Sequence, residues 1–261
     1  MKILVERIKE IMQSKELLKN LTSKELKLKY KNSAIGFVWS FFNPLIMMMV
    51  YTFAFKVIFR NPDPNYPIFI LSGLLPWTTF QTAIMGGTQS IVNNAHLIKK
   101  VYFPREIIPL SIVLSSFVNY LITLIILFAG IFIAKIPIGI PIIAFPIVLF
   151  LFLIFTIGLT LILSSLNVIY RDVSHFVEVA FMAWMYLTPV IYQMELIPEK
   201  IRPLMYLNPM TLVLNSIRAC LYENRFPSAK VVLALAIIAM VFLWIGFKVF
   251  NKIQKRFAEE I

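Results

Sequence analysis

The sequence of 261 residues contains few side chains that could perform covalent chemistry. Its two histidines are His96 and His175, and no carboxylates accompany either of them at the spacing of a metal site. Cys220 is the only cysteine, so an intrachain disulfide and a thiolate metal cage are both excluded. No serine is surrounded by a nucleophile elbow. We therefore expect no catalytic residue and no metal site in this chain.

The glycine pattern excludes nucleotide hydrolysis as well. A phosphate-binding P-loop has the sequence G-x-x-x-x-G-K-[ST], in which backbone N–H groups and the lysine hold the phosphates. None of the eight glycines in the chain is followed by lysine. The chain is therefore expected to bind no cofactor itself.

The composition indicates that lipid is the solvent for much of the chain. Hydrophobic residues make up 59% of the positions and charged residues 15%, whereas soluble domains are about half apolar and a quarter charged. The net charge is +12, but no basic stripe stands on a soluble fold, so we do not expect nucleic-acid binding. The charges lie almost wholly at the ends of apolar segments, which disfavours an ion pump with buried carboxylates. A conduit or a scaffold remains.

Hydropathy predicts an all-α integral membrane protein with six transmembrane helices. A helix needs about 20 apolar residues to cross a hydrocarbon core of about 30 Å. Residues 1–34 precede the first span and combine nine Lys or Arg with apolar residues at helical spacing. They are interpreted as a cytoplasmic amphipathic helix on the membrane surface, with an ordinary solvated helix as the alternative. The transmembrane domain is 35–261, with spans at about 35–58, 68–92, 107–134, 142–165, 179–194 and 229–247.

Three local patterns refine this division. Thr22 and Glu25 fit a capping box that would start a second N-terminal helix. The second span carries small and hydroxyl residues, which favour contact with other helices over contact with lipid. In 195–228, four prolines leave apolar pieces too short to cross, so either two re-entrant helices or an outside loop would fit.

The distribution of cations predicts the orientation. If the N-terminus is cytoplasmic, seventeen of the 25 Lys and Arg lie in cytoplasmic segments. The positive-inside rule therefore places both termini in the cytoplasm, and six spans agree with that parity.

Five short motifs follow one another along the chain, and together they resemble one family. They are Tyr30-Lys-Asn-Ser-Ala-Ile-Gly-Phe-Val-Trp-Ser-Phe-Phe-Asn-Pro44, Ser72-Gly-Leu-Leu-Pro-Trp77, Asn167-Val-Ile-Tyr-Arg-Asp172, Thr188-Pro-Val-Ile-Tyr192 and Leu207-Asn-Pro-Met210. In this order they resemble the permease subunits of type-2 bacterial polysaccharide ABC exporters, which export O-antigen or wall teichoic acid. The resemblance covers nearly the whole chain.

The resemblance implies a set of partners. Such permeases form homodimers in the bacterial inner (plasma) membrane, and each pairs with an ATPase subunit, so the complex holds two copies that bind ATP and Mg. The substrate would be a glycan linked to undecaprenyl diphosphate, moved from the cytoplasmic to the outer side. Residues 195–228 would correspond to two re-entrant helices that cap the outer end.

The resemblance also implies a gate at Ile35-Gly36, between the channel and the cytosol. Gly36 lies where the surface helix must turn into the first span, and glycine accepts backbone angles that other residues refuse. The gate and channel mouth would comprise Tyr30, Ile35, Gly36, Phe37, Trp39 and Phe42. The alternative is that these rings only anchor the chain at the membrane interface.

By the same resemblance, the loop after the second span, 93–106, docks on the ATPase. An apolar ridge on a cytoplasmic loop has little reason to exist unless a partner covers it. The expected docking residues are His96, Leu97, Lys99, Lys100, Tyr102, Phe103 and Arg105. Diphosphate contacts are expected from Lys99, Lys100, Arg105 and Arg171, unless these cations serve topology alone.

Three other functions are consistent with parts of the pattern. A drug or small-lipid exporter of the same superfamily would share the spans and the missing P-loop. A polytopic enzyme acting on polyprenyl lipids would need clustered cytoplasmic carboxylates, and Asp172 with Glu178 is not such a cluster. A purely structural membrane scaffold is the third alternative.

Overall fold

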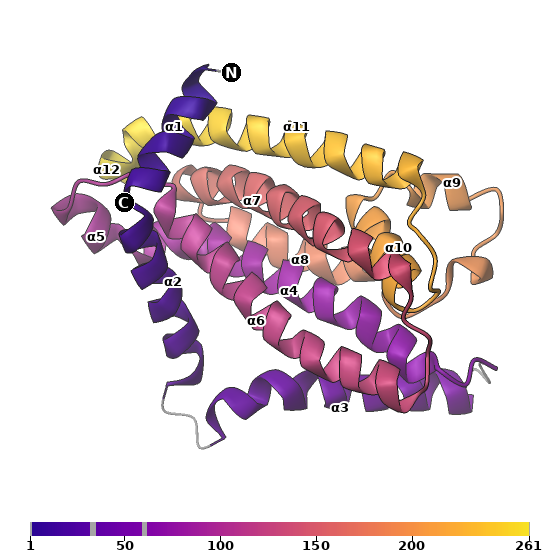
Figure 1. Ribbon diagram of the computed structural model, residues 1–261. Helices are drawn as coiled ribbons and strands as arrows, with labels where there is room; N and C mark the ends of the chain where they lie inside the picture. Colours follow the sequence, from indigo (N-terminus) through magenta and orange to yellow (C-terminus); the bar gives the residue numbers. More distant parts are fainter. Residues whose placement is uncertain (1, 32–34, 59–61, 261) are drawn as a thin grey trace.

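The computed structural model describes residues 2–31, 35–58 and 62–260, and in these ranges the chain forms helices and turns with no strand. Four long helices form the bundle, and a fifth, α3 (Trp39–Phe53), packs along it after the short turn η1 (Gly36–Val38) (Figure 1). The bundle helices are α4 (Tyr66–Asn93), α6 (Ile107–Ile133), α7 (Phe145–Ile169) and α11 (Ala229–Ile253). The all-α prediction is therefore confirmed for the described part of the chain.

Five helical segments in the described ranges are long and apolar enough to cross a membrane. They are Gly36–Ile58, Tyr66–Asn93, Ile107–Ile133, Ile140–Ile169 and Ala229–Arg256. The first includes α3 and η2 (Ala54–Ile58), and the fourth adds η3 (Ile140–Ala144) to α7. These segments correspond to five of the six predicted spans.

The remaining predicted span, the fifth at 179–194, is not a membrane-length helix. Its helix is α8 (Val173–Tyr186), whose 14 residues extend about 21 Å at 1.5 Å per residue, which is less than a hydrocarbon core. It ends shortly before Pro189, because a proline disfavours helical backbone in the residue that precedes it. Residues 187–192, which form turns and bends, follow α8.

The bundle has two ends, named here by what they carry. The terminal end carries both termini, α5 (Ala95–Lys100) and α12 (Phe257–Glu260) (Figure 1). The loop end carries the turns at 62–65, 134–140 and 222–228. Tyr222 donates a hydrogen bond of 2.6 Å to Asp63 there, and the Gln193 amide donates one of 3.1 Å to the same carboxylate. Residues 173–193 therefore join the two ends, although α8 alone is too short to do so.

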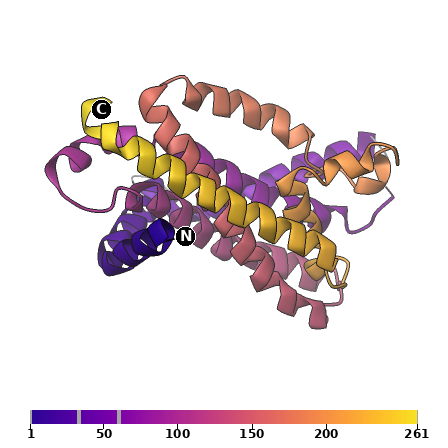
Figure 2. The same ribbon diagram turned by 90° about the horizontal axis from the view of Figure 1, so that it is seen from above.

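The N-terminal segment forms two helices that run crosswise to the bundle at the terminal end, as Figures 1 and 2 show. They are α1 (Lys2–Gln13) and α2 (Lys15–Tyr30), and the break falls at Ser14. The prediction that a second helix starts at Thr22 was wrong. Thr22 lies inside α2, and its hydroxyl donates a hydrogen bond of 2.7 Å to the Leu18 carbonyl. Ile11 is 9% exposed, and Leu18 and Leu21 pack on the same apolar cluster of bundle residues. Part of the amphipathic face therefore covers protein.

The tightest helix pair in the bundle is α7 against α11. A Cβ on Gly158 would lie 2.4 Å from the carbonyl carbon of Phe242, and one on Gly246 would lie 2.5 Å from the Gly158 oxygen. Small residues allow such backbone contact between membrane helices. In Figure 1 these two helices lie above α4.

Residues 195–228 fold back into the bundle from the loop end. The chain leaves Gln193 at that end, reaches Asn208 beside Trp184, and returns through α10 (Pro209–Leu221) to Tyr222. The other helix, α9 (Arg202–Met205), has only four residues. The two re-entrant helices of the prediction are therefore not confirmed.

Candidate functional site

A polar stripe runs along α4, which is otherwise buried. The exposed residues of this helix are Thr78, Thr82, Gly86, Gln89 and Asn93. Their spacing of four, four, three and four places them on one face of the helix. The neighbouring hydroxyls of Thr79 and Thr88 are instead buried and donate to their own helix. The interior helix predicted from these small and hydroxyl residues is thus confirmed, and one of its faces is open.

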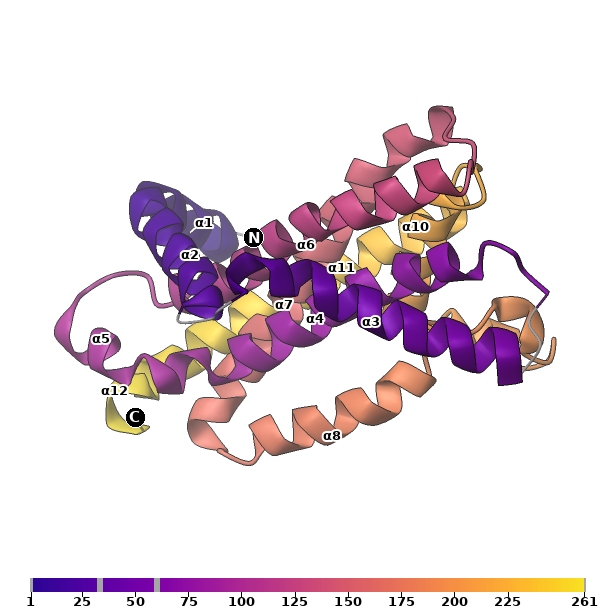
Figure 3. The ribbon, with the colours of Figure 1, turned by 90° about the horizontal axis from the view of Figure 1, so that it is seen from below.

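The helices that flank the stripe expose apolar side chains instead. α8 packs against α4 through Trp184, whose ring lies 6.3 Å from that of Trp77. In Figure 3, α3 crosses in front of α4, and α8 runs along one side of the molecule. The exposed apolar residues of α3 are Trp39, Phe42, Ile46, Met49, Phe53 and others at similar spacing. Those of α8 are Phe176, Val179, Met182 and Tyr186. The stripe on α4 is therefore a polar line between two apolar faces.

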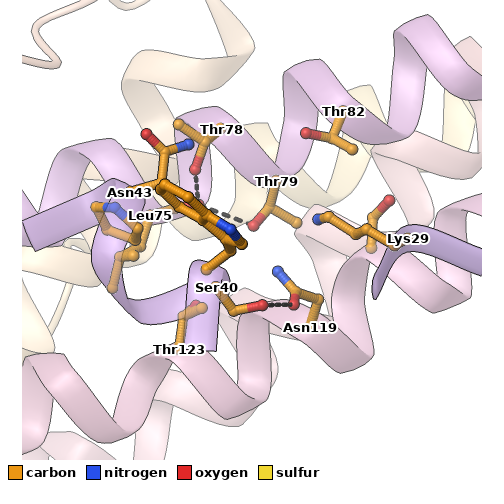
Figure 4. Close-up of a pocket in the computed structure, with 12 residues that line it drawn as sticks. Lys29, Ser40, Asn43, Leu75, Thr78, Thr79, Thr82, Asn119 and Thr123 are labelled. Carbon is orange, nitrogen blue, oxygen red and sulfur yellow. Dashed lines mark hydrogen bonds between the residues drawn. The ribbon is translucent and has the colours of Figure 1, made fainter. Parts of the chain in front are cut away.

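At Thr78 and Thr82 the stripe opens into a polar pocket with a volume of about 430 Å³. The pocket lies between α3 and α4, and it is called here the pocket beneath α3. Four helices supply its walls, and Figure 4 shows their side chains converging on it. The lining residues are Lys29, Trp39, Ser40, Asn43, Pro44, Leu75, Thr78, Thr79, Thr82, Ser116, Asn119 and Thr123. Thr82 lies eleven residues before the end of α4, which is about 16 Å along the helix axis. The pocket therefore lies well away from the terminal end of α4.

Two features border the pocket. Ser40 at the start of α3 donates a hydrogen bond of 2.8 Å to Asn119 on α6, which joins the first span to the third. Lys29, near the end of α2, extends into the pocket from the terminal side (Figure 4). Burial lowers the pKa of the Lys29 ammonium. The pocket thus has hydroxyls and amides along its walls and a cation at one side.

Of the predicted gate residues, Trp39 lines this pocket. Gly36 has φ +57°, so the turn into α3 uses the left-handed backbone that glycine permits. The rings of Trp39 and Phe42 lie 6.5 Å apart on one face, as their spacing predicted. Ile35 and Phe37 are exposed. Tyr30 ends α2, and its side chain lies outside the described residues.

The predicted docking loop stands away from the bundle at the terminal end. Tyr102 is fully exposed at 103%, whereas Phe103 is half-buried and packs on the terminal apolar cluster. His96, Lys99 and Lys100 are exposed on α5, and Leu97 is half-buried.

The four cations expected at the diphosphate separate into two groups. Lys99 and Lys100 are exposed at the end of α5. Arg105 instead donates to the carbonyl oxygen of Gln254, and Arg171 donates to that of Glu260 at 3.2 Å. The two arginines therefore hold the C-terminal segment.

Sequence reasoning missed a buried arginine, Arg218 on α10. It is 3% exposed, and its guanidinium donates to the carbonyls of Pro189 at 2.6 Å and Val190 at 2.7 Å. It also donates to the Ser72 hydroxyl at 3.3 Å and lies 3.7 Å from the centre of the Phe69 ring. A count of charges at helix ends could not reveal it, because it lies inside the ambiguous segment 195–228.

The same region unites three of the sequence motifs. Asn208 accepts hydrogen bonds from the Trp184 indole at 3.0 Å and from the Met210 backbone at 3.0 Å, and it donates to the Thr188 hydroxyl at 2.8 Å. Arg218 links Ser72 to residues 189–190, as described above. The motifs at 72–77, 188–192 and 207–210 therefore form one network that fixes α10.

Comparison with known proteins gives consistent matches. Residues 16–222 match the family described as ABC-2 type transporter. The chain is 37% identical to the O-antigen export system permease protein RfbA of Myxococcus xanthus over 99% of this chain and 100% of that protein. It is also 37% identical to a protein of the same name from Klebsiella pneumoniae, over 94% of each chain.

Proposed function

This chain belongs to the ABC-2 type transporter family, and from that premise we propose that it is the transmembrane permease subunit of an ATP-driven polysaccharide exporter. The relatives named above are O-antigen export permeases, which supports a glycan of that kind. The observation that carries the proposal is the polar stripe of α4, which leads into the pocket beneath α3. A scaffold in lipid has no use for such a line of polar groups, because exposed polar groups are costly in hydrocarbon.

The substrate is proposed to be a glycan linked to undecaprenyl diphosphate. A charged headgroup does not cross hydrocarbon easily, since one charged side chain at the bilayer centre costs roughly 2.5–3.5 kcal/mol. A polar path lowers that barrier but sets no direction, so energy must come from ATP. Seventeen of the 25 cations belong to segments at the terminal end, which supports a cytoplasmic location for that end and both termini. Lys99 and Lys100 are the exposed cations we assign to the diphosphate.

A separate ATPase is proposed to bind the loop at 93–106 and to carry the ATP and Mg. Tyr102 is fully exposed, so none of the residues that the structure describes covers its ring. An aromatic ring in that position fits a partner's pocket, because buried aromatic anchors dominate protein interfaces. Two ATPase copies would serve two permeases.

A second copy of the chain is proposed to complete the polar path. In one chain the stripe of α4 is open between α3 and α8, and both of these helices expose apolar rings and Met residues. Two such faces, brought together, would bury the apolar residues and shield the stripe from lipid. The segment 173–193 then serves as the sixth span, and α10 as one arm of a re-entrant hairpin at the outer side.

Gene deletion in the source bacterium tests the proposal. Loss of this chain should abolish surface glycan and leave lipid-linked glycan inside the cell. Wild-type protein and Tyr102→Phe should restore export, whereas Tyr102→Asp should not restore it and should lose the ATPase on co-purification. Unchanged surface glycan in the deletion strain would refute the function. Stoichiometric ATPase bound to Tyr102→Asp would refute the docking site.

A further inference from the structure

The pocket beneath α3 has a specific hydrogen-bonding character, and we infer that it binds a sugar ring of the exported glycan rather than a phosphate. The inference rests on the proposed function and adds a substrate subsite within each single chain. Three observations support it. They are the hydrogen-bond acceptors that the lining residues offer, the Trp39 ring among them, and the position of the pocket on the polar stripe.

Most of the hydroxyls that line the pocket already donate their proton in a hydrogen bond to a backbone carbonyl. A threonine or serine hydroxyl has one donor proton and two acceptor lone pairs. Thr78 donates to the Leu74 carbonyl at 2.8 Å, and Thr79 donates to that of Leu75 at 2.8 Å. On α6, Ser116 and Thr123 donate to backbone carbonyls in the same way, at 3.0 Å and 2.8 Å. These four hydroxyls therefore offer oxygen lone pairs to any ligand.

Because these hydroxyl oxygens are hydrogen-bond acceptors, the pocket disfavours binding of a phosphate group. Phosphodiester and diphosphate oxygens are acceptors, so against these hydroxyl oxygens they would lose hydrogen bonds to water and gain few in return. Among the lining residues Lys29 alone carries a positive charge, and it stands at one side. A sugar hydroxyl both donates and accepts, so it can donate a hydrogen bond to a threonine oxygen and also accept one from the Asn43 amide or the Lys29 ammonium. The pocket is thus complementary to a polyhydroxylated ligand.

Trp39 supplies the apolar part of the same site. Its ring belongs to the pocket lining, and an aromatic ring can cover the C–H face of a sugar while polar groups contact its hydroxyls. The volume of about 430 Å³ lies within the range of about 300–1,000 Å³ that small-ligand pockets occupy. The walls come from α2, α3, α4 and α6 of one chain (Figure 4). Each permease would therefore hold a sugar of its own.

The stripe on α4 provides the route to this site. From Asn93 at the terminal end, Gln89 and Gly86 lead along one face to Thr82 at the pocket. A glycan entering from the terminal end would meet this line first and the pocket next, with its diphosphate left near the exposed Lys99 and Lys100. The sugar site and the phosphate contacts are thereby separated along the path.

Photo-crosslinking in cells with the assembled exporter tests the site directly. Thr82→p-benzoylphenylalanine places the reactive ketone in the pocket, and Ile125→p-benzoylphenylalanine, at an exposed apolar position of α6, is the control. Illumination should give a glycan-positive adduct at position 82 several-fold above that at 125. Equal adducts at the two positions, or an adduct at 82 that carries phosphate lipid without sugar, would overturn the inference.

Export by matched threonine variants provides the second measurement. Thr82→Val keeps the shape of the side chain and removes its oxygen, and Thr82→Ser restores a hydroxyl. Thr88→Val removes a buried hydroxyl from the same helix that bonds only to its own backbone. Surface glycan per folded complex should fall roughly two- to tenfold for Thr82→Val and should stay near wild type for Thr82→Ser and Thr88→Val. Equal export by the Val variants at 82 and 88 would contradict a sugar contact at 82. Failure of the wild-type complex to export glycan would instead contradict the proposed function.

Discussion

Replacing Gly36 by alanine should weaken the turn that connects α2 to α3. The backbone at Gly36 has φ +57°, which costs other L-residues roughly 1–2 kcal/mol. A Cβ there would meet no atom within 4 Å, so the penalty comes from the backbone angle and not from a collision. A penalty of that size lowers the population of the native turn roughly five- to thirtyfold.

Hydrogen–deuterium exchange of the complex in detergent measures this population directly. The amides at 35–40 should exchange faster in Gly36→Ala by a factor of that order, while the amides of α7 should not change. Gly36→Asn is the matched control, because asparagine adopts left-handed backbone more readily than other non-glycine residues. If the turn is part of the gate, export per folded complex should change in Gly36→Ala and recover in Gly36→Asn.

Two results would refute this reasoning. Equal exchange in Gly36→Ala and wild type would mean that the left-handed turn is not required. Equal damage by alanine and asparagine would mean that side-chain volume, and not the backbone angle, decides the outcome. If exchange rises as expected while export stays normal, the turn anchors α3 but does not gate the path.

Three further substitutions test other parts of the structure. Gly73→Ala places a Cβ 2.4 Å from the Val190 oxygen. This overpacking should cost about 1–3 kcal/mol of the free energy of unfolding and lower the unfolding temperature. Gly130→Ala, the control, meets only the flexible end of Ile68 and should cost less. Asn208→Ala removes the helix cap and the indole acceptor, and it should cost about 1–3 kcal/mol and shift the tryptophan fluorescence. Burial raises the pKa of Glu106 above its ordinary 4.5 despite Arg7 at 3.8 Å, so stability should fall as the pH rises through the raised pKa. Thermal unfolding should therefore show Glu106→Gln more stable than wild type at pH 8 and equal to it near pH 4, and parallel curves would contradict this.

The sequence predicted the long spans well because length and hydropathy are local properties. Proline position also decided the outcome at the fifth predicted span, where Pro189 shortens the helix, but the way in which residues 187–193 continue to Asp63 depends on partners distant in sequence. The same limit applies to the N-terminal break. The residue pattern at Thr22 fits a cap, whereas packing of the apolar face on the bundle sets the break at Ser14.

The candidate site was only partly predictable. Small and hydroxyl residues marked α4 as an interior helix, yet the sequence could not separate the open Thr78 and Thr82 from the buried Thr79 and Thr88. That distinction depends on which neighbour covers each face. Arg218 escaped notice for a related reason, since the carbonyls that receive its hydrogen bonds lie 28 and 29 residues away in the sequence.

The backbone contact between α7 and α11 has a mechanical consequence. Where Gly158 and Gly246 meet, no side chains lie between the two helices, so neither can slide without driving backbone atoms into backbone atoms. This pair therefore acts as a rigid frame. We therefore expect movement during transport to occur outside this pair, in α3, which packs on α4 and α6 and begins at the glycine turn, and in α8 with its irregular extension.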